Sequence, residues 1–443
     1  MIVLWTDALI YILISVAVIL FFSLRKKEHF TRPWQKVTQS RVGMASLVFL
    51  SFFMFIGLLD SIHFKPTKAN NNEIISVLDY WATPIRKQQE KSYSAPFSAH
   101  LYSKELISVA GKESHWGYRR LEYGARHIQD VTTEKHGDIF NKAVFGFAKG
   151  AAIIIVLYCC YHWLRRQALF QEKAVNSVFT TLLLLSSISY MLVDLSGYYH
   201  VLGTDKVGED VFYQAIKSIR TGLVIGSLTT LIMLPLAIIF GILAGFFRGW
   251  VDDVIQYIYT TLNSIPGVLL IAASILMVQV YMANHQEQFT SLIVRADMRL
   301  LFLCLILGVT SWTGLCRMLR AETLKLREME YVQAARALGV PRYQILARHI
   351  LPNVMHIILI SVVLDFSSLV LAEAVLSYVN IGVDPTTYSW GNMINGARLE
   401  MAREPVVWWS LAASFIFMFS LVLAANLFAD TVRDAFDPRR VSL

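Results

Sequence analysis

Carboxylates inside apolar stretches are the residues of this sequence whose chemistry most needs an explanation. Asp365 lies near the middle of the apolar run 354–378, and Glu373 lies close to the end of the same run. A charged group is costly in such a segment and usually has a function there. Asp365 can line a polar pathway or pair across a subunit interface, or it can stay protonated or hydrogen-bonded and serve only in packing. Glu373 is a second candidate for the pathway, although we expect it to fix the following turn rather than to bind a ligand.

Residues for catalysis, metal binding or nucleotide binding do not occur at the required spacings. The phosphate-binding pattern G-x-x-x-x-G-K-[ST] is missing, because Gly111 and Lys112 are followed by Glu113. The four cysteines lie in or at the end of apolar runs, and neither C-x-x-C nor H-E-x-x-H occurs. We therefore expect no catalytic residue, no metal ligand and no cofactor in this chain.

A polar stretch between two apolar runs, residues 317–353, carries a two-helix pattern. Helix formers dominate over 321–338, and Gly339 can then end the helix. Pro341 stands where a second short helix could begin, and Pro352 is expected to end that helix. The pattern predicts a helix, a tight glycine turn and a second helix, which lie on the inner face of a membrane.

The first of these helices would present small apolar side chains at helical spacing. Ala334, Ala335 and Leu338 fall on one face, with Tyr331 beside them. Small side chains allow the groove of another protein to approach the backbone closely. The alternative is an amphipathic helix that rests on lipid headgroups. The residues by themselves leave both possibilities open.

The elements that must position these residues follow from the composition. Of 443 residues, 55% are hydrophobic and 16% are charged, and the formal net charge is +8. Soluble domains contain about 45–50% apolar and about 25% charged residues. The composition excludes a disordered chain, a collagen-like chain and a disulfide scaffold, and it indicates an integral membrane protein. A basic chain could bind nucleic acid, but no groove-reading motif occurs, so we expect no nucleic-acid partner.

The apolar residues form nine runs, each long enough to cross about 30 Å of hydrocarbon as a helix. The sequence therefore predicts an all-α membrane protein with about nine transmembrane helices embedded in the lipid bilayer. The predicted spans are 2–24, 42–62, 145–164, 176–196, 220–246, 255–281, 299–316, 354–378 and 406–429.

Lysine and arginine are concentrated in alternate connections, which predicts the orientation of the chain. The basic residues 25–27 follow the first run, whereas the short connections 282–298 and 379–405 carry few basic residues. We therefore expect the N-terminus outside and the C-terminus in the cytoplasm. Residues 64–144 would then form a long outside segment, either a small folded cap or a tether.

Within 317–353, the stretch QAARALG…HILPN resembles the EAA loop of ABC importer permeases. The matching positions are Ala334, Ala335, Gly339, Leu351 and Pro352. Gln333 stands where the family has Glu, which keeps a polar helix former but removes a charge. The residues that the resemblance and the predicted hairpin assign to ATPase coupling are Tyr331, Gln333, Ala334, Ala335, Leu338, Gly339, Pro341 and Pro352.

Further motifs resemble dipeptide and oligopeptide permeases of the C type, and they occur in the family order. LGTDKVGED at 202–210 resembles LGTD-x-x-G-R-D, with Glu209 in place of Arg. The stretch 373–396, EAVLSYVNIGVDPTTYSWGNMING, resembles the segment after the fifth family span. The resemblance covers about residues 200–443, a little over half of the chain.

This resemblance implies a six-helix type I ABC importer core, to which the nine predicted spans add three. The implied organisation has five parts. These are an extra N-terminal span with a cytoplasmic linker (1–41), the first core span (42–63), an extracytoplasmic segment (64–144), an extra pair of spans (145–197), and a permease core (198–443) with its coupling loop at 317–353.

The function implied by the resemblance is that of a permease subunit in an ATP-driven importer of the bacterial cytoplasmic membrane. Its cargo would be dipeptides, oligopeptides or peptide-like compounds. The implied partners are a second permease subunit, two ATP-binding ABC subunits and an extracytoplasmic substrate-binding protein. ATP and magnesium would bind to the ATPase partners. Two alternatives are an ion-coupled secondary transporter and a regulatory membrane subunit.

Overall fold

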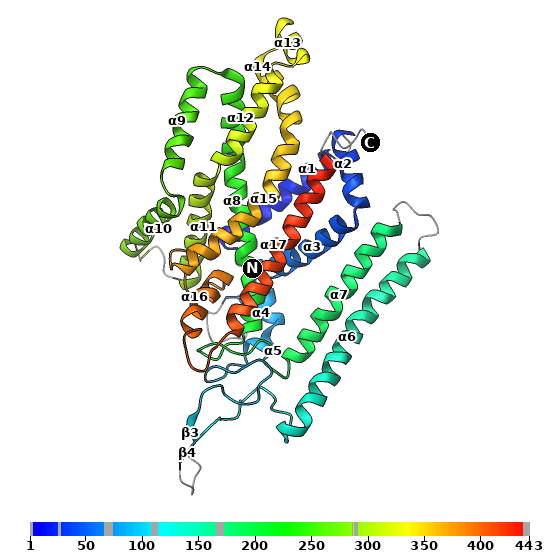
Figure 1. The fold of residues 1–443 in the computed structure, drawn as a ribbon, viewed down its shortest axis with the longest axis vertical. Helices are drawn as coiled ribbons and strands as arrows, with labels where there is room; N and C mark the ends of the chain where they lie inside the picture. The colour runs from blue at the N-terminus through cyan, green and yellow to red at the C-terminus, as the bar shows by residue number, and fades with distance from the viewer. Residues whose placement is uncertain are drawn as a thin grey trace. The chain divides into compact units, whose positions relative to one another are not determined.

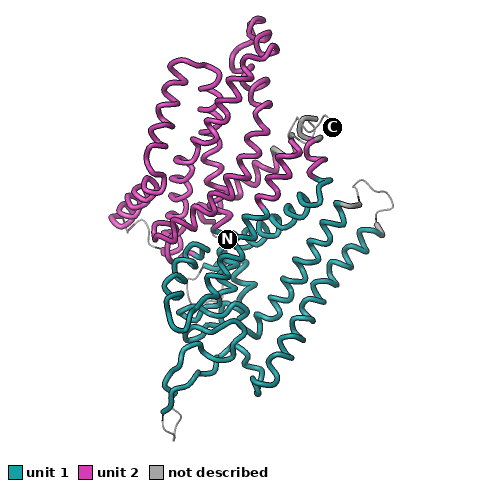
Figure 2. The backbone as a smooth tube through the Cα atoms, in the orientation of Figure 1, with its two compact units in different colours: residues 1–2, 38–221, 388–424 teal, residues 3–37, 222–387, 425–443 magenta. Residues whose placement is uncertain are grey.

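The computed structural model describes residues 3–24, 28–65, 74–107, 114–164, 172–285, 287 and 291–436. Most of these residues are α-helical (Figure 1), and the chain groups into two compact units (Figure 2). Unit 1 comprises residues 1–2, 38–221 and 388–424, and unit 2 comprises residues 3–37, 222–387 and 425–443. Two long helices, α8 (Val211–Phe247) and α17 (Trp409–Phe436), contribute residues to both units.

Unit 1 contains three long helices and a folded segment between two of them. The three long helices are α3 (Arg41–Ser61), α6 (Val131–Leu164) and α7 (Glu172–Ser196). The shorter elements are β1 (His63–Phe64), β2 (Ile75–Ser76), α4 (Val77–Trp81), α5 (Thr83–Arg86), β3 (Glu105–Ile107), β4 (His115–Gly117) and α16 (Trp390–Glu400). β1 pairs with β2 and β3 pairs with β4, both antiparallel. The described residues before 131 are therefore folded, whereas residues 131–144 of the predicted outside segment belong to α6. We call the described residues of 74–130 the cap.

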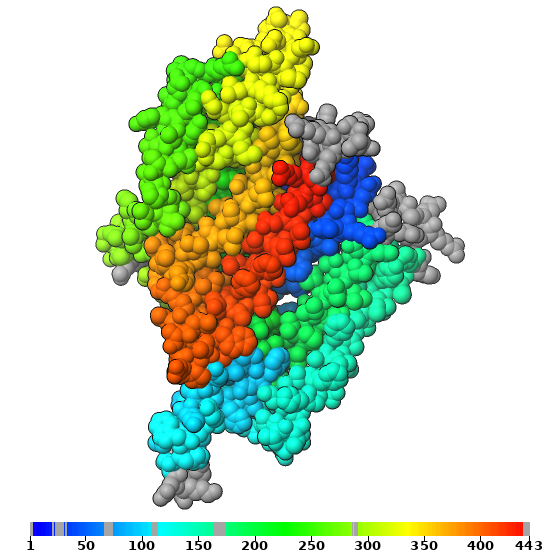
Figure 3. All heavy atoms as spheres, viewed as in Figure 1, coloured from blue at the N-terminus to red at the C-terminus, as the bar shows by residue number. Residues whose placement is uncertain are grey.

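Helices α6 and α7 pack closely because small residues line their contact. A Cβ atom on Gly146 would lie 2.8 Å from Met191 Cα, and one on Gly150 would lie 2.5 Å from the Ser186 carbonyl oxygen. Such small residues let two backbones approach within a membrane, where apolar burial alone gives no preference for protein over lipid. Figure 3 shows the two helices as one continuous layer of side chains in unit 1. The two helices therefore form a closely packed helical hairpin.

Unit 2 holds the polar stretch 317–353 on a core made by several helices. Its elements are α1 (Trp5–Leu24), α2 (Glu28–Gln39), α9 (Trp250–Ser264), α10 (Gly267–Asn284), α11 (Leu292–Ser311), α12 (Thr313–Arg327), α13 (Glu330–Ala337), α14 (Arg342–Ile345), a π-helical turn η2 (Leu346–Ile350) and α15 (Leu351–Tyr378). Buried side chains such as Met233, Leu319, Val332 and Val354 join α8, α12, α13 and α15 in one core. The fold of this core therefore fixes the position of α13.

The prediction of an all-α membrane fold is confirmed. Seven helices among the described residues are long and apolar enough to cross a membrane. The two other predicted spans correspond to α1 and to α11. Helix α11 is not among the seven because Arg295, Asp297 and Arg299 lie in its first half.

The predicted span 255–281 is wrong as a single helix. The chain forms α9 and α10 there, separated at Ile265 and Pro266, both of which have extended ψ angles. The ring of a proline clashes with the carbonyl four residues earlier, so an α-helix does not continue through it without a kink. The residues on both sides of this break are apolar, so hydropathy alone predicts one continuous span.

Candidate functional site

The predicted helix over 321–338 is divided in two. Helix α12 ends at Arg327, and Met329 has an extended backbone (ψ 142°) that starts α13 on a new axis. The side-chain amide of Gln333 donates a hydrogen bond of 3.1 Å to the carbonyl oxygen of Glu328. That carbonyl lies beyond the last turn of α12 and needs a donor. Gln333 supplies one, which the Glu of the family pattern could not do in its ionised form.

A glycine turn follows α13, as predicted. Gly339 has a φ of +76°, and its N–H donates to the carbonyl of Arg336 at 3.1 Å. The N–H of Val340 donates to the carbonyl of Ala335, also at 3.1 Å. These two bonds form a Schellman motif, which satisfies the last carbonyls of a helix and requires a left-handed residue. We call the segment Glu330–Ile350 the coupling hairpin.

The predicted apolar face of α13 is wrong in one position. Ala335 is 8% exposed and belongs to the core of unit 2, together with Val332. Leu338 is 83% exposed, and Tyr331 and Ala334 are exposed with it. Residues three and four apart share a helix face, so 331, 334 and 338 form the outward stripe. Ala335 lies at the edge of that stripe, on the side of Val332, and the two residues, three apart, pack together into the core.

The second half of the coupling hairpin also departs from the prediction. Pro341 precedes α14 as its N-cap, and α14 continues through the π-helical turn η2 into α15. Pro352 therefore lies in the first turn of α15 and does not end a helix. A proline is tolerated at the first helical positions because no N–H is needed there. The π turn ahead of it supplies that local break in the α-helical pattern.

Charged groups hold together the helices that precede the coupling hairpin. Arg320 donates two hydrogen bonds to Asp252, from Nε at 2.6 Å and from Nη2 at 2.7 Å. These bonds lower the pKa of Asp252 from its ordinary value. Arg327 donates from Nη1 to the carbonyl of Phe246 at 2.7 Å. A bidentate arginine–carboxylate pair gives both strength and direction, so α9, α12 and the end of α8 hold one geometry.

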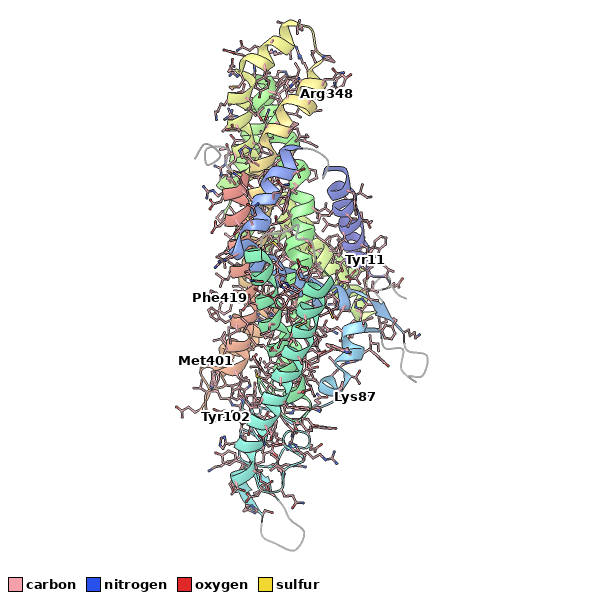
Figure 4. The ribbon with its side chains drawn as sticks, turned by 90° about the vertical axis from the view of Figure 1, so that its right-hand side faces the viewer. Tyr11, Lys87, Tyr102, Arg348, Met401 and Phe419 are labelled. Carbon is pink, nitrogen blue, oxygen red and sulfur yellow. The ribbon has the colours of Figure 1, made fainter. Side chains whose placement is uncertain are left out.

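The outer surface of the coupling hairpin is apolar and basic. Leu338 and Tyr343 are largely exposed, at 83% and 69%. Arg336 and Arg342 lie over the rings of Phe246 and Phe247, at 5.8 Å and 5.7 Å from the ring centroids. Figure 4 labels Arg348, which lies on η2 in the same hairpin. The arrangement suits docking of a protein with an apolar groove and an acidic rim.

The two candidate pathway carboxylates differ in their surroundings. Glu373 is 2% exposed and accepts a hydrogen bond of 2.7 Å from the hydroxyl of Ser377. Gly382, which follows the end of α15, packs against Ser377. Asp365 is half-buried, and the residues that the structure describes form no hydrogen bond or ion pair with its carboxylate.

A buried acid–histidine–acid cluster lies in unit 1, beside the LGTD loop at 202–210. His200 Nδ1 is 2.7 Å from Asp210 Oδ2, and His200 Nε2 is 3.4 Å from Glu90 Oε1. Glu90 also accepts hydrogen bonds from the backbone N–H groups of residues 122–124. We call Glu90, His200 and Asp210 the outer clasp. It joins the cap to the loop.

Burial and hydrogen bonding compete in the outer clasp. Burial disfavours the imidazolium of His200, but hydrogen bonds and charge attraction from Asp210 and Glu90 outweigh it and raise the pKa of His200 to about 9. Burial likewise disfavours ionised Glu90, but hydrogen bonds from His200 and from the three backbone N–H groups lower its pKa to about 2. His200 and Glu90 are therefore both charged at neutral pH. Sequence inspection missed Glu90 and His200; the only local signal was the position of His200, directly before LGTD.

Comparison with known proteins places these features in a family. Residues 237–442 match the family described as binding-protein-dependent transport system inner membrane component. The chain is 31% identical to the dipeptide transport system permease protein DppC of Lactococcus lactis over 240 residues, which are 54% of this chain and 64% of that protein.

Two other relatives are covered more completely. The chain is 31% identical to the glutathione transport system permease protein GsiD of Pectobacterium atrosepticum over 242 residues, 54% of this chain and 73% of the relative. It is also 31% identical to the oligopeptide transport system permease protein OppC of Mycobacterium bovis over 252 residues, 57% of this chain and 80% of the relative. The family match includes the whole coupling hairpin and the candidate carboxylates, and it begins after the cap and the α6–α7 pair. The chain therefore belongs to the family of binding-protein-dependent transport system inner membrane components, the multi-pass inner-membrane permeases of ABC importers.

Proposed function

We propose that this chain is the permease subunit of an ATP-driven importer for dipeptides, oligopeptides or peptide-like compounds such as glutathione. The names of the matched relatives support this range of cargo. The observation that carries the proposal is the coupling hairpin. It presents an exposed apolar tip at Leu338 on a helix whose other face, at Val332 and Ala335, belongs to the core of unit 2.

The coupling hairpin then acts as a lever between ATPase and permease. Tyr331, Ala334 and Leu338 contact the ATPase subunit, and Gly339 and Pro341 set the angle of the tip. Val332 and Ala335 pass the movement to α8, α12 and α15, whose side chains they contact in one core. Gln333 and Pro352 keep the two ends of the hairpin in place. Because packed cores switch between discrete arrangements rather than deforming continuously, closure of the ATPases would switch the side to which the spans are open.

The complete importer contains further subunits in this proposal. It has a second permease subunit, two ATP-binding subunits that hold ATP and magnesium, and an extracytoplasmic substrate-binding protein. The N-terminus lies outside and the C-terminus lies in the cytoplasm. This orientation puts the coupling hairpin in the cytoplasm, with the ATPases, and puts the cap outside. The permease core begins at about residue 198.

The two carboxylates take different roles in this proposal. Asp365 lines the pathway or pairs with the second permease, because a half-buried carboxylate without a described partner in its own chain is costly in a span. Glu373 keeps the end of α15 in shape through Ser377. Asp365→Asn is expected to lower transport, whereas Glu373→Gln is expected to lower stability as well.

The decisive experiment is recovery of the assembled complex. The tagged full-length chain is extracted in mild detergent, and co-purifying proteins are identified by mass spectrometry. We expect a second permease and subunits with Walker motifs, and an ATPase activity that rises when peptide-loaded binding protein is added. A chain that purifies alone under several gentle conditions would contradict the proposal and favour secondary transport or a regulatory role.

A matched pair of variants tests the docking surface itself. Leu338→Asp places a charge at the 83% exposed tip, and Leu399→Asp does the same at a 72% exposed leucine of α16, in the other unit. Burial of a leucine contributes about 1.5–3 kcal/mol, and about 1.4 kcal/mol changes an equilibrium tenfold. Leu338→Asp should therefore lower ATPase recovery about tenfold to hundredfold. Equal recovery for the two variants would show that Leu338 does not contact the ATPase.

A further inference from the structure

The β3–β4 hairpin of unit 1 exposes its aromatic side to solvent. Leu106 and Trp116 are direct cross-strand partners, and they are 57% and 70% exposed. Tyr118, two residues after Trp116, is 53% exposed, and Lys104 lies 5.7 Å from the centroid of its ring. Side chains on a strand alternate between two faces, so Lys104, Leu106, Trp116 and Tyr118 share one face. We call these four residues the hairpin face.

The opposite side of the hairpin is more buried than the hairpin face, although His115 on it is exposed. Glu105 and Ile107 are half-buried, and Glu105 pairs with Lys91 at 2.8 Å. A hairpin that buried its largest apolar side chains would have Trp116 on this more buried side. Trp116 instead lies on the exposed side. Most of the apolar area of the hairpin face is therefore not buried by the described part of the chain. Exposed apolar clusters of this kind mark interaction sites.

The hairpin is also held rigidly. Beyond β3 and β4 the two strands remain connected, because Leu101 N–H donates to the Arg119 carbonyl at 2.8 Å and Leu121 N–H donates to the Ala99 carbonyl at 3.0 Å. Ala99 then joins a buried cluster with residues of the LGTD side, including Tyr199. A surface fixed in this way loses little conformational entropy when it binds a partner.

The position of the hairpin favours water over lipid. β3 and β4 lie at the same end of unit 1 as the start of α6 (Figure 1), and the atoms around them stand clear of α6 in the face shown by Figure 3. The first turns of α6, residues 131–142, contain Thr132, Glu134 and Asp138 and are polar. At 1.5 Å per residue they extend about 18 Å from the apolar part of the helix. The hairpin face therefore lies off the membrane.

The charge around the hairpin face is positive. Among the described residues of 104–122, the exposed basic side chains are Lys104, Arg119 and Arg120, and the exposed carboxylate is Glu122, which lies 3.8 Å from Arg119. Tryptophan, tyrosine and arginine are the residue types that dominate binding energy at protein interfaces. A partner that fits this surface has an apolar patch surrounded by carboxylates.

We propose that the hairpin face docks the soluble substrate-binding protein of this importer, through an apolar patch with an acidic rim on that protein. The inference rests on the proposed function, since it names the partner that delivers the cargo. It assigns this contact to a segment outside the family match at 237–442. The occupant that the position of the hairpin disfavours is an anionic lipid surface.

Two equally exposed tryptophans give a matched test. The assembled importer, reconstituted with its binding protein, is compared as wild type, Trp116→Ala and Trp81→Ala; both tryptophans are 70% exposed. We expect Trp116→Ala to weaken binding of the binding protein about tenfold to hundredfold. Trp81→Ala should change it less than twofold, and basal ATPase activity should be unchanged in both. Lys104→Glu should also weaken binding of the binding protein, and this loss should be larger at low salt than at high salt. Equal affinity for wild type and Trp116→Ala would overturn the proposal.

A crosslinking experiment identifies the occupant directly. A photoreactive benzoylphenylalanine replaces Trp116 in the full chain in cells, and the adduct is identified by mass spectrometry. An adduct with the binding protein supports the proposal, whereas an adduct with lipid alone, or no adduct, overturns it. Failure here is distinct from failure of the proposed function, because wild-type importer that recruits ATPases and responds to loaded binding protein keeps that function intact.

Discussion

Replacing Gly339 with residues that differ in their tolerance of a positive φ tests the coupling hairpin most sharply. The φ of this residue is +76°, and beyond its immediate chain neighbours no described atom lies within 4 Å of the position that a Cβ would occupy. A side chain at 339 therefore meets open space, and any cost of substitution comes from the backbone. Asn, Ala and Val form a series in which that backbone cost rises.

The magnitude follows from the conformational preference of each residue. The left-handed conformation costs an ordinary L-residue about 1–2 kcal/mol, whereas asparagine adopts it more readily. Valine is worse than alanine because its branched Cβ crowds the backbone. A loss of about 1–2 kcal/mol in the Schellman turn changes the population of the correct hairpin about 5–30-fold. We expect Gly339→Asn to be nearly neutral, Gly339→Ala intermediate and Gly339→Val most damaging.

The assay is the affinity of the detergent-purified chain for its ATPase subunit, together with stimulated ATPase activity. Gly137→Val is the matched control. It adds the same side chain to another glycine with open space around it, but in a helix of ordinary φ. The thermal stability of each variant shows whether the rest of the chain has remained folded.

The order of the series decides the outcome. If Gly339→Val and Gly137→Val bind the ATPase equally well, the left-handed turn does not set the docking geometry. If Asn and Val at 339 are equally damaging, loss of the glycine acts through contact with the partner and not through φ. Either result would refute the reasoning from backbone conformation.

Three further perturbations test separate contacts. Gln333→Glu removes the hydrogen bond to the Glu328 carbonyl, which is worth about 0.5–1.5 kcal/mol; ATPase affinity should fall about 2–10-fold by titration, and an unchanged affinity would contradict the role of this amide. The pKa of His200 is raised from 6.5 to about 9, so its contribution to stability is complete below pH 6.5 and is lost as the pH rises through 9. Thermal unfolding of the purified chain should therefore show lower stability at pH 9.5 than at pH 6.5, a dependence that His200→Gln should reduce and that a flat wild-type profile would disprove. Arg320→Lys keeps the charge but loses one of the two bonds to Asp252, so coupled ATPase activity should fall while membrane insertion, measured by fractionation, stays normal; full coupling would exclude a positioning role for the pair.

The sequence allowed the membrane fold and the glycine turn to be predicted, because both depend on local composition. A run of about 20 apolar residues is sufficient for a span, and Gly339 is the usual residue for a helix end. The interior of the coupling hairpin was less predictable. Helix propensity is continuous through Met329, and only the packing of Val332 and Ala335 into the core explains why α13 takes a new direction there.

The outer clasp could not be predicted from local pattern at all. Glu90 and His200 are 110 positions apart, and nothing in the composition around either residue indicates the other. Each reads as an ordinary polar residue outside a span. Their pairing depends on how the cap folds over the LGTD loop, which is a property of tertiary structure. Gln333 departs from the family pattern in the sequence. Its hydrogen bond to the Glu328 carbonyl could not be predicted, because it depends on the break between α12 and α13.

The separation of Glu90 from His200 also has a consequence for biosynthesis. At about 5–20 residues per second, a ribosome needs about 5–20 s to make the 110 residues that separate them. During that interval the α6–α7 pair is synthesised and inserted, and the carboxylate of Glu90 cannot yet pair with His200. The first part of the cap therefore stays incompletely folded until the start of the permease core, which contains His200, has been synthesised. Quality-control proteases and chaperones would meet it in that form, and a nascent chain arrested before residue 200 should be degraded much faster than one whose His200 has left the ribosome.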